Sequence, residues 1–303
     1  MDRIDTMNAF VSVVTEGSFA RAAERLDISP QLVSKYVSQL EEHLGTRLLN
    51  RTTRKVSVTE AGTAYFQRAQ QVLNDIDDME NELGDLQHSV RGLLRINAPV
   101  SFAIQHMASV LTAYRAAFPE VQVDLQLNDR KVDIVQEGFD IALRIGQLKS
   151  SSLIARRIAP VRLSICASPD YLARQGIPSH PDELKQHQYL RYSYMDNETS
   201  FRDRKRNLPL TTTLHSDFSA NNGDVLLNAA IAGAGVIIQP TFITGPAIVS
   251  GQLQSILEDF EPEPLGLYAV YAHRQFLSAK VRSFIDFIGG YFGDPPYWDA
   301  FSH

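Results

Sequence analysis

This 303-residue chain is poor in cysteine and lacks a long apolar run. Its single cysteine, Cys166, excludes an internal disulfide and fits a reducing cytoplasm. No uninterrupted apolar stretch approaches the roughly 18 residues of a membrane span, so we expect no membrane association. Because Asp2, Arg3 and Asp5 stand before any apolar run, we also expect no signal peptide. These absences predict a cytoplasmic protein.

Motifs for catalysis, metals and cofactors are also lacking. There is neither a Gly-x-Ser-x-Gly elbow nor a phosphate-binding loop. The eight histidines show no metal-ligand spacing. Cys166 is best interpreted as a small buried apolar group, because a redox sensor needs an exposed thiolate and usually a second cysteine. We therefore expect no catalytic residue, no metal and no cofactor, and a protein that is not an enzyme.

Positive charge is scarce overall but concentrated locally. The net charge is −6, although residues 1–60 hold eight basic and eight acidic side chains. Residues 61–90 hold one arginine and six acids, which leaves −1 for residues 91–303. Global charge therefore neither predicts nor forbids nucleic-acid binding, and the local distribution decides.

Two short helices joined by a turn are predicted near the N-terminus. Ser18 is a good N-cap for a helix that ends near Leu26, and Asp27-Ile28 break this helix. Ser29 caps a second helix, with Pro30 at its first position, where a missing N–H is harmless. Two capped helices with so short a connection form a helix-turn-helix.

The second helix has two different faces. Apolar residues at helical spacing form a stripe that we expect to be buried: Val33, Val37, Leu40 and Leu44. Polar side chains with hydrogen-bond donors occupy another face: Gln31, Ser34, Lys35 and Ser38. A recognition helix needs such a face to reach base edges and phosphates in the major groove. An ordinary solvated face has a similar composition, so this pattern alone leaves both interpretations open.

A basic hairpin is predicted over residues 47–58. Val56 and Val58 alternate with polar residues, and Thr52-Thr53 marks the tip. Residues 47–55 hold four cations and no acid: Arg47, Arg51, Arg54 and Lys55. A basic hairpin after a helix-turn-helix is a wing that can hold the phosphate backbone.

These features together resemble the DNA-binding domain of LysR-type transcriptional regulators. The matching residues are Phe10-Val11-Ser12-Val13-Val14, Gly17-Ser18-Phe19, Ala22-Ala23, Leu26, Val33-Ser34, Leu40-Glu41, Leu44-Gly45, Leu48-Leu49, Arg51-Thr52-Thr53-Arg54 and Thr59-Glu60-Ala61-Gly62. The resemblance implies a winged helix-turn-helix over residues 1–59. The DNA-binding residues we expect are Ser18, Ser29, Gln31, Ser34, Lys35, Ser38, Arg51, Thr52, Thr53 and Arg54.

A long helix is predicted from the Thr59 cap to about Gln87, within a linker of residues 60–90. Its apolar residues follow a spacing of four and three over three heptads: Tyr65, Ala69, Val72, Ile76, Met79, Leu83 and Leu86. Such a seam favours a coiled coil with a second copy of the chain, although a helix that lies on its own domain would show the same pattern. A dimer through this seam would present two recognition helices to a two-fold operator.

Strands and helices alternate after the linker. We expect strands at residues 93–97, 121–127, 141–145, 163–167 and 267–272, and helices at residues 101–118, 132–137 and 279–291, with a helix followed by a strand over residues 225–238. This alternation predicts a mainly parallel sheet in an α/β fold.

This second part resembles the effector-binding domain of the same family, a two-lobed fold like type 2 periplasmic binding proteins. The matching segments are Ile96-Asn97-Ala98-Pro99, Phe118-Pro119-Glu120-Val121, Glu137-Gly138-Phe139-Asp140-Ile141-Ala142, Ala167-Ser168-Pro169-Asp170-Tyr171-Leu172 and Ala232-Gly233-Ala234-Gly235. The resemblance implies an effector-binding domain at 91–303. One lobe covers about 92–162 and 266–303, the other about 163–265, and the two chain crossings form a hinge.

The predicted effector site follows from the ends of the strands. Ligands of open α/β sheets bind beyond the carboxyl ends of the strands. The residues we expect there are Pro99, Val100, Ser101, Phe102, Asp129, Arg144, Asn221 and Asn222. Ser101 opens a helix, so its hydroxyl could hold an anion or only cap the helix. Arg144 could pair with an anionic effector or form a salt bridge at the strand end.

The sequence therefore predicts a regulator of transcription whose binding to promoter DNA responds to a small-molecule effector, one option being an anion. Expected partners are double-stranded promoter DNA, a second copy of the chain through the linker helix, a homotetramer of such dimers, and RNA polymerase if the protein activates. Two alternatives remain open here. One is a ligand-binding protein whose N-terminal domain only oligomerises, and the other is an enzyme fused to a DNA-binding domain.

Overall fold

The structure is a computed structural model that describes residues 2–52, 55–84, 90–130, 132–147, 153–272 and 277–300. The chain forms two compact units, one of residues 1–89 with 135–138 and one of residues 90–134 with 139–303. Each unit is described by itself. None of the helices in these residues is both long and apolar enough to cross a membrane.

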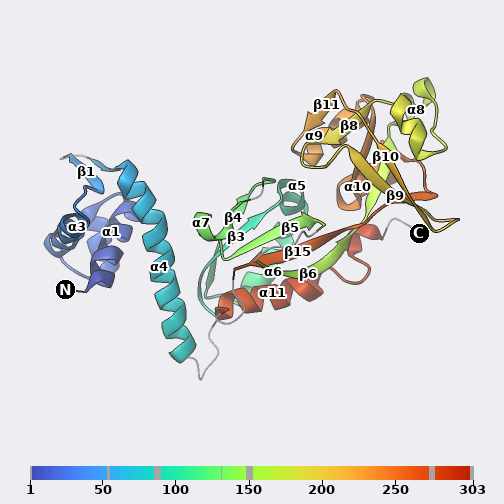
Figure 1. The fold of residues 1–303 in the computed structure, drawn as a ribbon. Helices are drawn as coiled ribbons and strands as arrows, with labels where there is room; N and C mark the ends of the chain where they lie inside the picture. The colour runs from blue at the N-terminus through green and yellow to red at the C-terminus, as the bar shows by residue number, and fades with distance from the viewer. Residues whose placement is uncertain are drawn as a thin grey trace. The chain divides into compact units, whose positions relative to one another are not determined.

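The N-terminal unit contains three short helices, drawn in blue in Figure 1. They are α1 (Arg3–Glu16), α2 (Phe19–Leu26) and α3 (Pro30–Leu44). The helices α1 and α3 end at Gly17 and Gly45, which adopt left-handed φ angles of 62° and 64° that glycine accepts without strain. Their apolar faces meet in one core, which includes Ala9, Phe10, Val13, Ala22, Val33, Val37 and Leu40. The predicted helix-turn-helix is confirmed.

One residue of the predicted apolar stripe lies outside this core. Val33, Val37 and Leu40 are buried, but Leu44 is 39% exposed. The prediction for Leu44 was wrong because this residue ends α3, where the chain turns at Gly45, and its side chain lies outside the core that Val33, Val37 and Leu40 enter.

A two-stranded hairpin and a long helix complete the unit. The strands β1 (Leu49–Thr52) and β2 (Lys55–Val58) pair antiparallel, with Leu49 opposite Val58. The helix α4 (Glu60–Gly84) follows, and the Thr59 hydroxyl accepts a hydrogen bond from the Gly62 N–H at 2.9 Å. The hairpin and the Thr59 cap were both predicted. Residues 85–89, into which the predicted helix extends, lie outside the described residues.

The C-terminal unit contains two five-stranded sheets (Figure 1). The first has the order β4-β3-β5-β15-β6, and its strands are β3 (Gly92–Ala98), β4 (Val121–Leu127), β5 (Ile141–Gly146), β6 (Ile154–Val161) and β15 (Leu265–Tyr271). The helices α6 (Ala108–Ala117) and α11 (Ala279–Tyr291) contact each other and lie against this sheet. A short helix, α7 (Ile134–Glu137), precedes β5.

The second sheet has the order β11-β8-β12-β7-β13. Its strands are β7 (Leu163–Ala167), β8 (Tyr189–Tyr192), β11 (Phe218–Ala220), β12 (Val236–Pro240) and β13 (Gln254–Ser255). The helices α9 (Gly223–Ile231) and α10 (Thr241–Val249) pack on it, and α8 (Pro169–Gln175) and the 3-10 helix η2 (Pro181–Gln186) lie between β7 and β8 in the chain. A third sheet joins β9 (Glu198–Asp203), β10 (Leu208–Thr213) and β14 (Phe260–Pro262).

Both large sheets are mixed, which corrects the prediction of a mainly parallel sheet. In the first sheet, β3 is parallel to β4 and β5, whereas β15 is antiparallel to β5 and β6. In the second, β8 is parallel to β11 and β12, whereas β7 is antiparallel to β12 and β13. In each sheet one strand is reversed: β7, with which the chain enters the second sheet after β6, and β15, with which it returns to the first.

One long helix of this unit is not uniform. The chain forms α5 (Val100–Phe102), then a π-helical turn η1 (Ala103–Met107), and then α6. The prediction was a single helix over residues 101–118. The π turn is a local departure that the apolar spacing does not encode.

Candidate nucleic-acid interface and ligand site

The N-terminal end of α3 is fixed by a side-chain cap. The Ser29 hydroxyl accepts a hydrogen bond from the Leu32 N–H at 3.2 Å, and Pro30 occupies the first helical position. Beyond the cap, Gln31, Lys35 and Ser38 are exposed, and Ser34 is half-buried. The predicted polar face of α3 therefore stands on the surface of the unit, where it can reach a nucleic acid.

Ser18 occupies the predicted cap position of α2 without the predicted bond. Its backbone is extended, with φ −156°, but its side chain makes no capping hydrogen bond. The turn between the helices is instead held by the backbone, since the Ile28 N–H donates to the Ala23 carbonyl at 3.1 Å. Asp27 takes the left-handed conformation, with φ 54°, that reverses the chain.

The hairpin is attached to α3 by a carboxylate that sequence reasoning did not assign. The N–H groups of Leu48 and Leu49 both donate to Glu41 Oε1, at 2.8 and 3.0 Å. The Thr59 hydroxyl donates to the Arg47 carbonyl at 2.8 Å on the other side. Glu41 appeared in the sequence only as part of the family pattern, and an acid directly after the apolar stripe was the available signal.

The basic residues of the hairpin are only partly described. Arg51 and Thr52 lie in β1, opposite Val56 and Lys55. Thr53 and Arg54, at the predicted tip, lie outside the described residues. The backbone of a wing is therefore present at the predicted place, and the phosphate-binding roles of these four residues remain a prediction.

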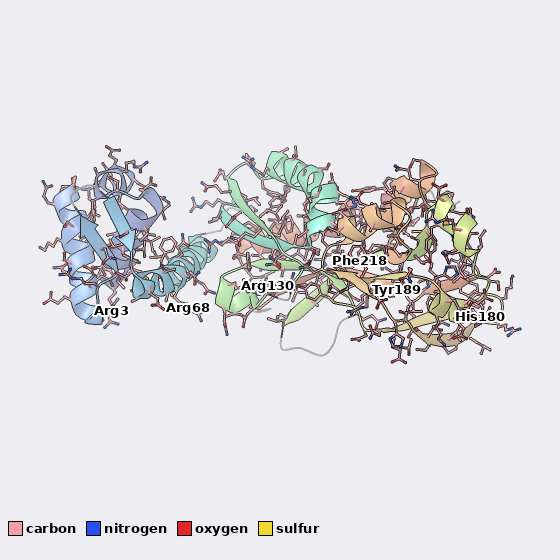
Figure 2. The ribbon with its side chains drawn as sticks, turned by 90° about the horizontal axis from the view of Figure 1, so that it is seen from above. Arg3, Arg68, Arg130, His180, Tyr189 and Phe218 are labelled. Atoms are coloured by element: carbon pink, nitrogen blue, oxygen red, sulfur yellow. The ribbon has the colours of Figure 1, made fainter. Side chains whose placement is uncertain are left out.

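In the C-terminal unit, the start of α5 is occupied by a carboxylate of the chain itself. The Val100 N–H donates to Asp129 Oδ1 at 3.0 Å. Pro99, not Ser101, is the cap residue, which corrects the predicted capping role of Ser101. Asp129 lies on the loop after β4, next to Arg130, which is labelled in Figure 2. This places Pro99, Val100 and Asp129 together, as predicted from the strand ends.

Ser101 connects elements that belong to the two different sheets. Its hydroxyl donates to Asp224 Oδ2 at 2.8 Å, and the two residues are 123 positions apart in the chain. Ser101 follows β3 of the first sheet, whereas Asp224 lies in the first turn of α9, which packs on the second sheet. The bond therefore links the two halves of the C-terminal unit.

The carboxyl of Asp129 has a raised pKa. Burial is the main cause, the Val100 N–H opposes it, and the negative charge of Asp224 raises the pKa further. A hydrogen bond from Asn222 and the positive charge of Arg144 act in the other direction. These influences place Asp129, Asp224, Asn222 and Arg144 in one cluster, which we call the acidic cluster.

Arg144 is held by the neighbouring strand. Its Nη1 donates to Asn97 Oδ1 at 2.8 Å and to the Leu143 carbonyl at 3.2 Å. Asn97 is 1% exposed, and its amide donates to the Gln126 carbonyl at 3.2 Å. The guanidinium is thus oriented by Asn97 of the adjacent strand β3, and the Asn97 side chain is in turn held by β4.

The other three residues predicted for the effector site lie in three different surroundings. Asn222 caps α9, because its side chain accepts from the N–H groups of Asp224 and Val225. Asn221 is exposed. Phe102 is fully buried in the core against Phe242 and Trp298, and its contact with an effector stays a prediction. Its position follows from the helix, because two successive residues cannot present the same face.

Sequence reasoning missed Asp224, Gln239 and Tyr192. A Cβ atom at Gly223 would lie 3.1 Å from Gln239 Oε1 and 3.4 Å from the Ser101 hydroxyl, so these groups approach the same backbone. The pKa of Tyr192 is raised by burial and by the charge of Asp129. Asp224 follows Asn221-Asn222-Gly223, and this polar start of a helix was the signal that could have included it.

Cys166 is fully buried, and burial raises the pKa of its thiol to about 12. This confirms its interpretation as a small core residue.

Within the described ranges, no group of three or more histidine, cysteine, aspartate or glutamate side chains is placed to hold a metal ion. The arrangement as a whole can hold a polar ligand between two sheets and present a polar helix to a nucleic acid.

Comparisons with protein families agree with both parts. Residues 4–63 match the bacterial regulatory helix-turn-helix proteins of the lysR family, and residues 87–293 match the LysR substrate binding domain. The chain is 39% identical over 281 residues to an HTH-type transcriptional regulator of Haemophilus influenzae, covering 93% of this chain and 98% of that protein. It is 33% identical over 292 residues to the regulator DmlR of Escherichia coli, covering 96% and 95%.

Solved structures give the same result. A full-length AphB variant aligns with a TM-score of 0.63 at 29% identity, covering 95% of this chain and 98% of AphB. CrgA of Neisseria meningitidis, described as a LysR-type transcriptional regulator, aligns with a TM-score of 0.58 at 31% identity, covering 94% and 97%. The two alternative classes find no support among these relatives. The chain belongs to the LysR-type transcriptional regulators, which bind DNA and carry an effector-binding regulatory domain.

Proposed function

We propose that this regulator reads promoter DNA with the exposed polar face of α3 and holds phosphates with the wing. The observation that carries the proposal is the Ser29 cap, which fixes an α3 surface on which Gln31, Lys35 and Ser38 are exposed. Ser34 lies at the edge of this face, and Ser18 stands at the start of the preceding helix. Side chains of these types reach base edges and groove walls.

The wing supplies the sequence-independent part of the binding. Arg51, Thr52, Thr53 and Arg54 contact the phosphate backbone in this proposal. The Glu41 carboxylate supports it, because it holds the start of the hairpin against α3 through two N–H groups. The wing and the recognition helix then bind the DNA as one body.

Two copies of the chain pair through α4. Val72 is 43% exposed at a seam position, and a coiled coil would cover it. Pairing presents two α3 helices to an operator with two-fold symmetry, and two such dimers form a tetramer on promoter DNA. We place this activity in the bacterial cytoplasm, with RNA polymerase as a further partner if the protein activates transcription.

The effector binds at the acidic cluster, between lobes of about 92–162 with 266–303 and about 163–265. The groups that sequence analysis offered to an anion are already bonded to carboxylates, since Val100 donates to Asp129 and Ser101 donates to Asp224. An anionic effector must displace these carboxylates and then pair with Arg144. An effector that carries hydrogen-bond donors binds Asp129 and Asp224 where they stand, so we favour a donor-bearing or zwitterionic effector over a simple anion.

The mechanism depends on the bond between the two sheets. An effector that replaces the Ser101–Asp224 bond binds one arrangement of the lobes better than another, and this difference shifts the population. In an oligomer on DNA, the shift changes the spacing of the recognition helices.

The experiment is the capture and sequencing of genomic fragments by the purified chain at increasing salt concentration. We expect a few enriched sites with interrupted two-fold symmetry that persist as salt rises. Gln31→Ala should change the enriched sequence, whereas His43→Ala, at the exposed far end of the same helix, should not. Uniform binding that disappears with salt would contradict the assignment of α3 as a sequence reader.

A further inference from the structure

A groove lies against the aromatic C-terminal tail of the second unit. It has a volume of about 870 Å³ and is lined by three segments that are distant in the sequence. They are the π turn and the start of α6, the helix α10, and the chain from Tyr291 to Ala300, which includes the 3-10 helix η3 (Tyr297–Asp299). The groove shares no lining residue with the acidic cluster.

The walls of this groove are held by specific contacts. The Tyr297 hydroxyl is 2.7 Å from His106 Nδ1, and the Thr241 hydroxyl donates to Asp299 Oδ1 at 2.6 Å. The Trp298 ring packs edge-on against Phe102 and contacts Phe242. The tail therefore forms one wall of the groove and joins α10 to the π turn.

No lining residue carries a charge. Burial lowers the pKa of His106 to about 4, so this side chain is neutral at physiological pH. The other lining side chains are aromatic, aliphatic, hydroxyl or amide groups. An ionised ligand would lose part of its hydration here without gaining a counter-charge. The groove consequently selects against ions, in contrast to the acidic cluster.

Two hydrogen-bonding atoms of lining residues have no partner in the described part of the chain. They are His106 Nε2 and Trp298 Nε1, on side chains that are 6% and 7% exposed. The indole nitrogen can only donate, and His106 Nε2 carries the proton when the Tyr297 hydroxyl donates to Nδ1. Buried donors without an acceptor are unfavourable and call for an explanation, and a hydrogen-bond acceptor from outside the chain would satisfy them.

We propose that this groove is a second small-molecule site, for an uncharged aromatic compound that carries a carbonyl or a similar hydrogen-bond acceptor. Phe242, Tyr297 and Trp298 offer ring faces and edges to such a compound. The volume of the groove is within the range of small-molecule sites, roughly 300–1,000 Å³. Val249 is 70% exposed and Tyr297 is 48% exposed, so the groove is open to solvent. Binding moves the tail enough to bring the acceptor to the two shielded donors.

The chain provides its own reporter for this site. Trp298 is its single tryptophan, so fluorescence excited selectively in tryptophan reports the groove. The full-length protein is titrated with benzamide, which is uncharged and carries a carbonyl, and with benzoate, which has the same ring and a negative charge. Ligand-observed NMR in the absence of DNA gives an independent measure of binding, so the outcome does not depend on the proposed DNA recognition.

We expect saturable binding of benzamide with a dissociation constant on the order of millimolar, as is usual for so small a compound. Benzoate should bind at least about tenfold more weakly. Ser109→Phe, which fills the groove, should weaken benzamide binding at least about tenfold. Thr112 is exposed on the same helix and does not line the groove, so Thr112→Phe should change the dissociation constant of benzamide by less than about twofold.

Three results of the titrations would overturn the proposal, and a fourth comes from sedimentation. The three are the absence of saturable benzamide binding to the unmodified chain, equal binding of benzamide and benzoate, and equal weakening by the two phenylalanine variants. Sedimentation at several protein concentrations tests another occupant. If the Trp298 emission changes with protein concentration alone, together with the sedimenting mass, a second copy of the chain covers this face and the small-molecule site is rejected.

Discussion

The surface of α3 and the acidic cluster are assembled in different ways. Along α3, each determining contact is local: Ser29 caps the helix three residues ahead, and Glu41 reaches Leu48 and Leu49 seven and eight residues ahead. In the acidic cluster, Val100 meets Asp129 across 29 positions, and Ser101 meets Asp224 across 123. The first surface can therefore form from short-range signals, whereas the second exists only once two sheets have folded and met.

The largest expected effect concerns Gly62, where α4 approaches the backbone before the wing closely. A Cβ atom there would lie 2.1 Å from the Leu48 carbonyl oxygen. Gly62→Ala should reduce the free energy of unfolding of this unit by about 4 kcal/mol, because backbone must shift. Calorimetry of the full chain measures the loss as an early transition.

Gly290→Ala is the matched control for this experiment. Gly290 also lies in a helix, but a Cβ atom there meets nothing within 4 Å. Alanine has the better helix propensity, so this variant should be neutral or stabilising by up to about 1 kcal/mol. If both variants lose the same stability, the close approach of α4 to the wing does not matter.

His106 tests the long-range assembly of the second unit, because it is buried against a tail residue, Tyr297, 191 positions away in the chain. Its pKa is about 4 in the folded chain, below the ordinary value near 6.5. The neutral form is thus favoured on folding, so this contribution is complete above pH 6.5 and is lost as the pH falls toward 4. Relative to the His106→Phe variant, the native chain should lose on the order of 3 kcal/mol of unfolding free energy as the pH falls from 6.5 to about 4.

The measurement is calorimetry of the C-terminal unit at several pH values. Tyr297→Phe is the control: it removes the hydroxyl beside Nδ1 but keeps the ring, and burial is the cause of the lowered pKa. It should therefore keep the pH dependence of the native chain. A native chain and a His106→Phe variant with parallel pH profiles would contradict the burial of a neutral imidazole.

Gln31 and Arg54 test whether α3 and the wing divide their work as proposed. Gln31→Ala should reduce affinity for the preferred operator by about 2 kcal/mol and affect other sequences little, as expected for a base contact. Arg54→Ala should weaken all sequences about equally and lower the slope of log affinity against log salt by about 1. Titrations of operator and random DNA at four salt concentrations separate the two, and an unchanged slope for Arg54→Ala would refute its phosphate contact.

The smallest expected effect concerns the bond between the two sheets. Ser101→Ala removes the hydroxyl that donates to Asp224, which should cost about 1 kcal/mol of stability in the C-terminal unit. Thr112→Ala removes a hydroxyl that bonds only within its own helix, and it should change little. Calorimetry compares them, and equal transitions would show that the Ser101–Asp224 bond does not hold the two halves together.

The prediction from sequence succeeded where short-range chemistry decides. The cap at Ser29, the break at Asp27 and the hairpin strands around Thr52 all follow from neighbouring residues. Leu44 was predicted to be buried because the apolar spacing of α3 continues to this residue, whereas the last residue of α3 in the core is Leu40.

The ligand site could be predicted only in part. The strand ends led to Val100, Asp129, Arg144 and Asn222, which do meet. Asp224 was missed, because it reaches Ser101 from an element of the other sheet, and no local pattern records that contact. The mixed sheets were missed for the same reason, since strand direction depends on where the chain crosses between them.

The π turn at Ala103–Met107 has a consequence for how this family member could change. A π turn contains one residue more than an α turn, and each residue of an α-helix advances by about 100°. The turn that carries Ser101 is therefore out of phase with the face of α6 that buries Val110 and Tyr114. Deleting one residue from this turn would rotate Ser101 away from Asp224 and leave the anchoring face of α6 in place. A single codon lost here would therefore break the Ser101–Asp224 bond between the two sheets without substituting either residue.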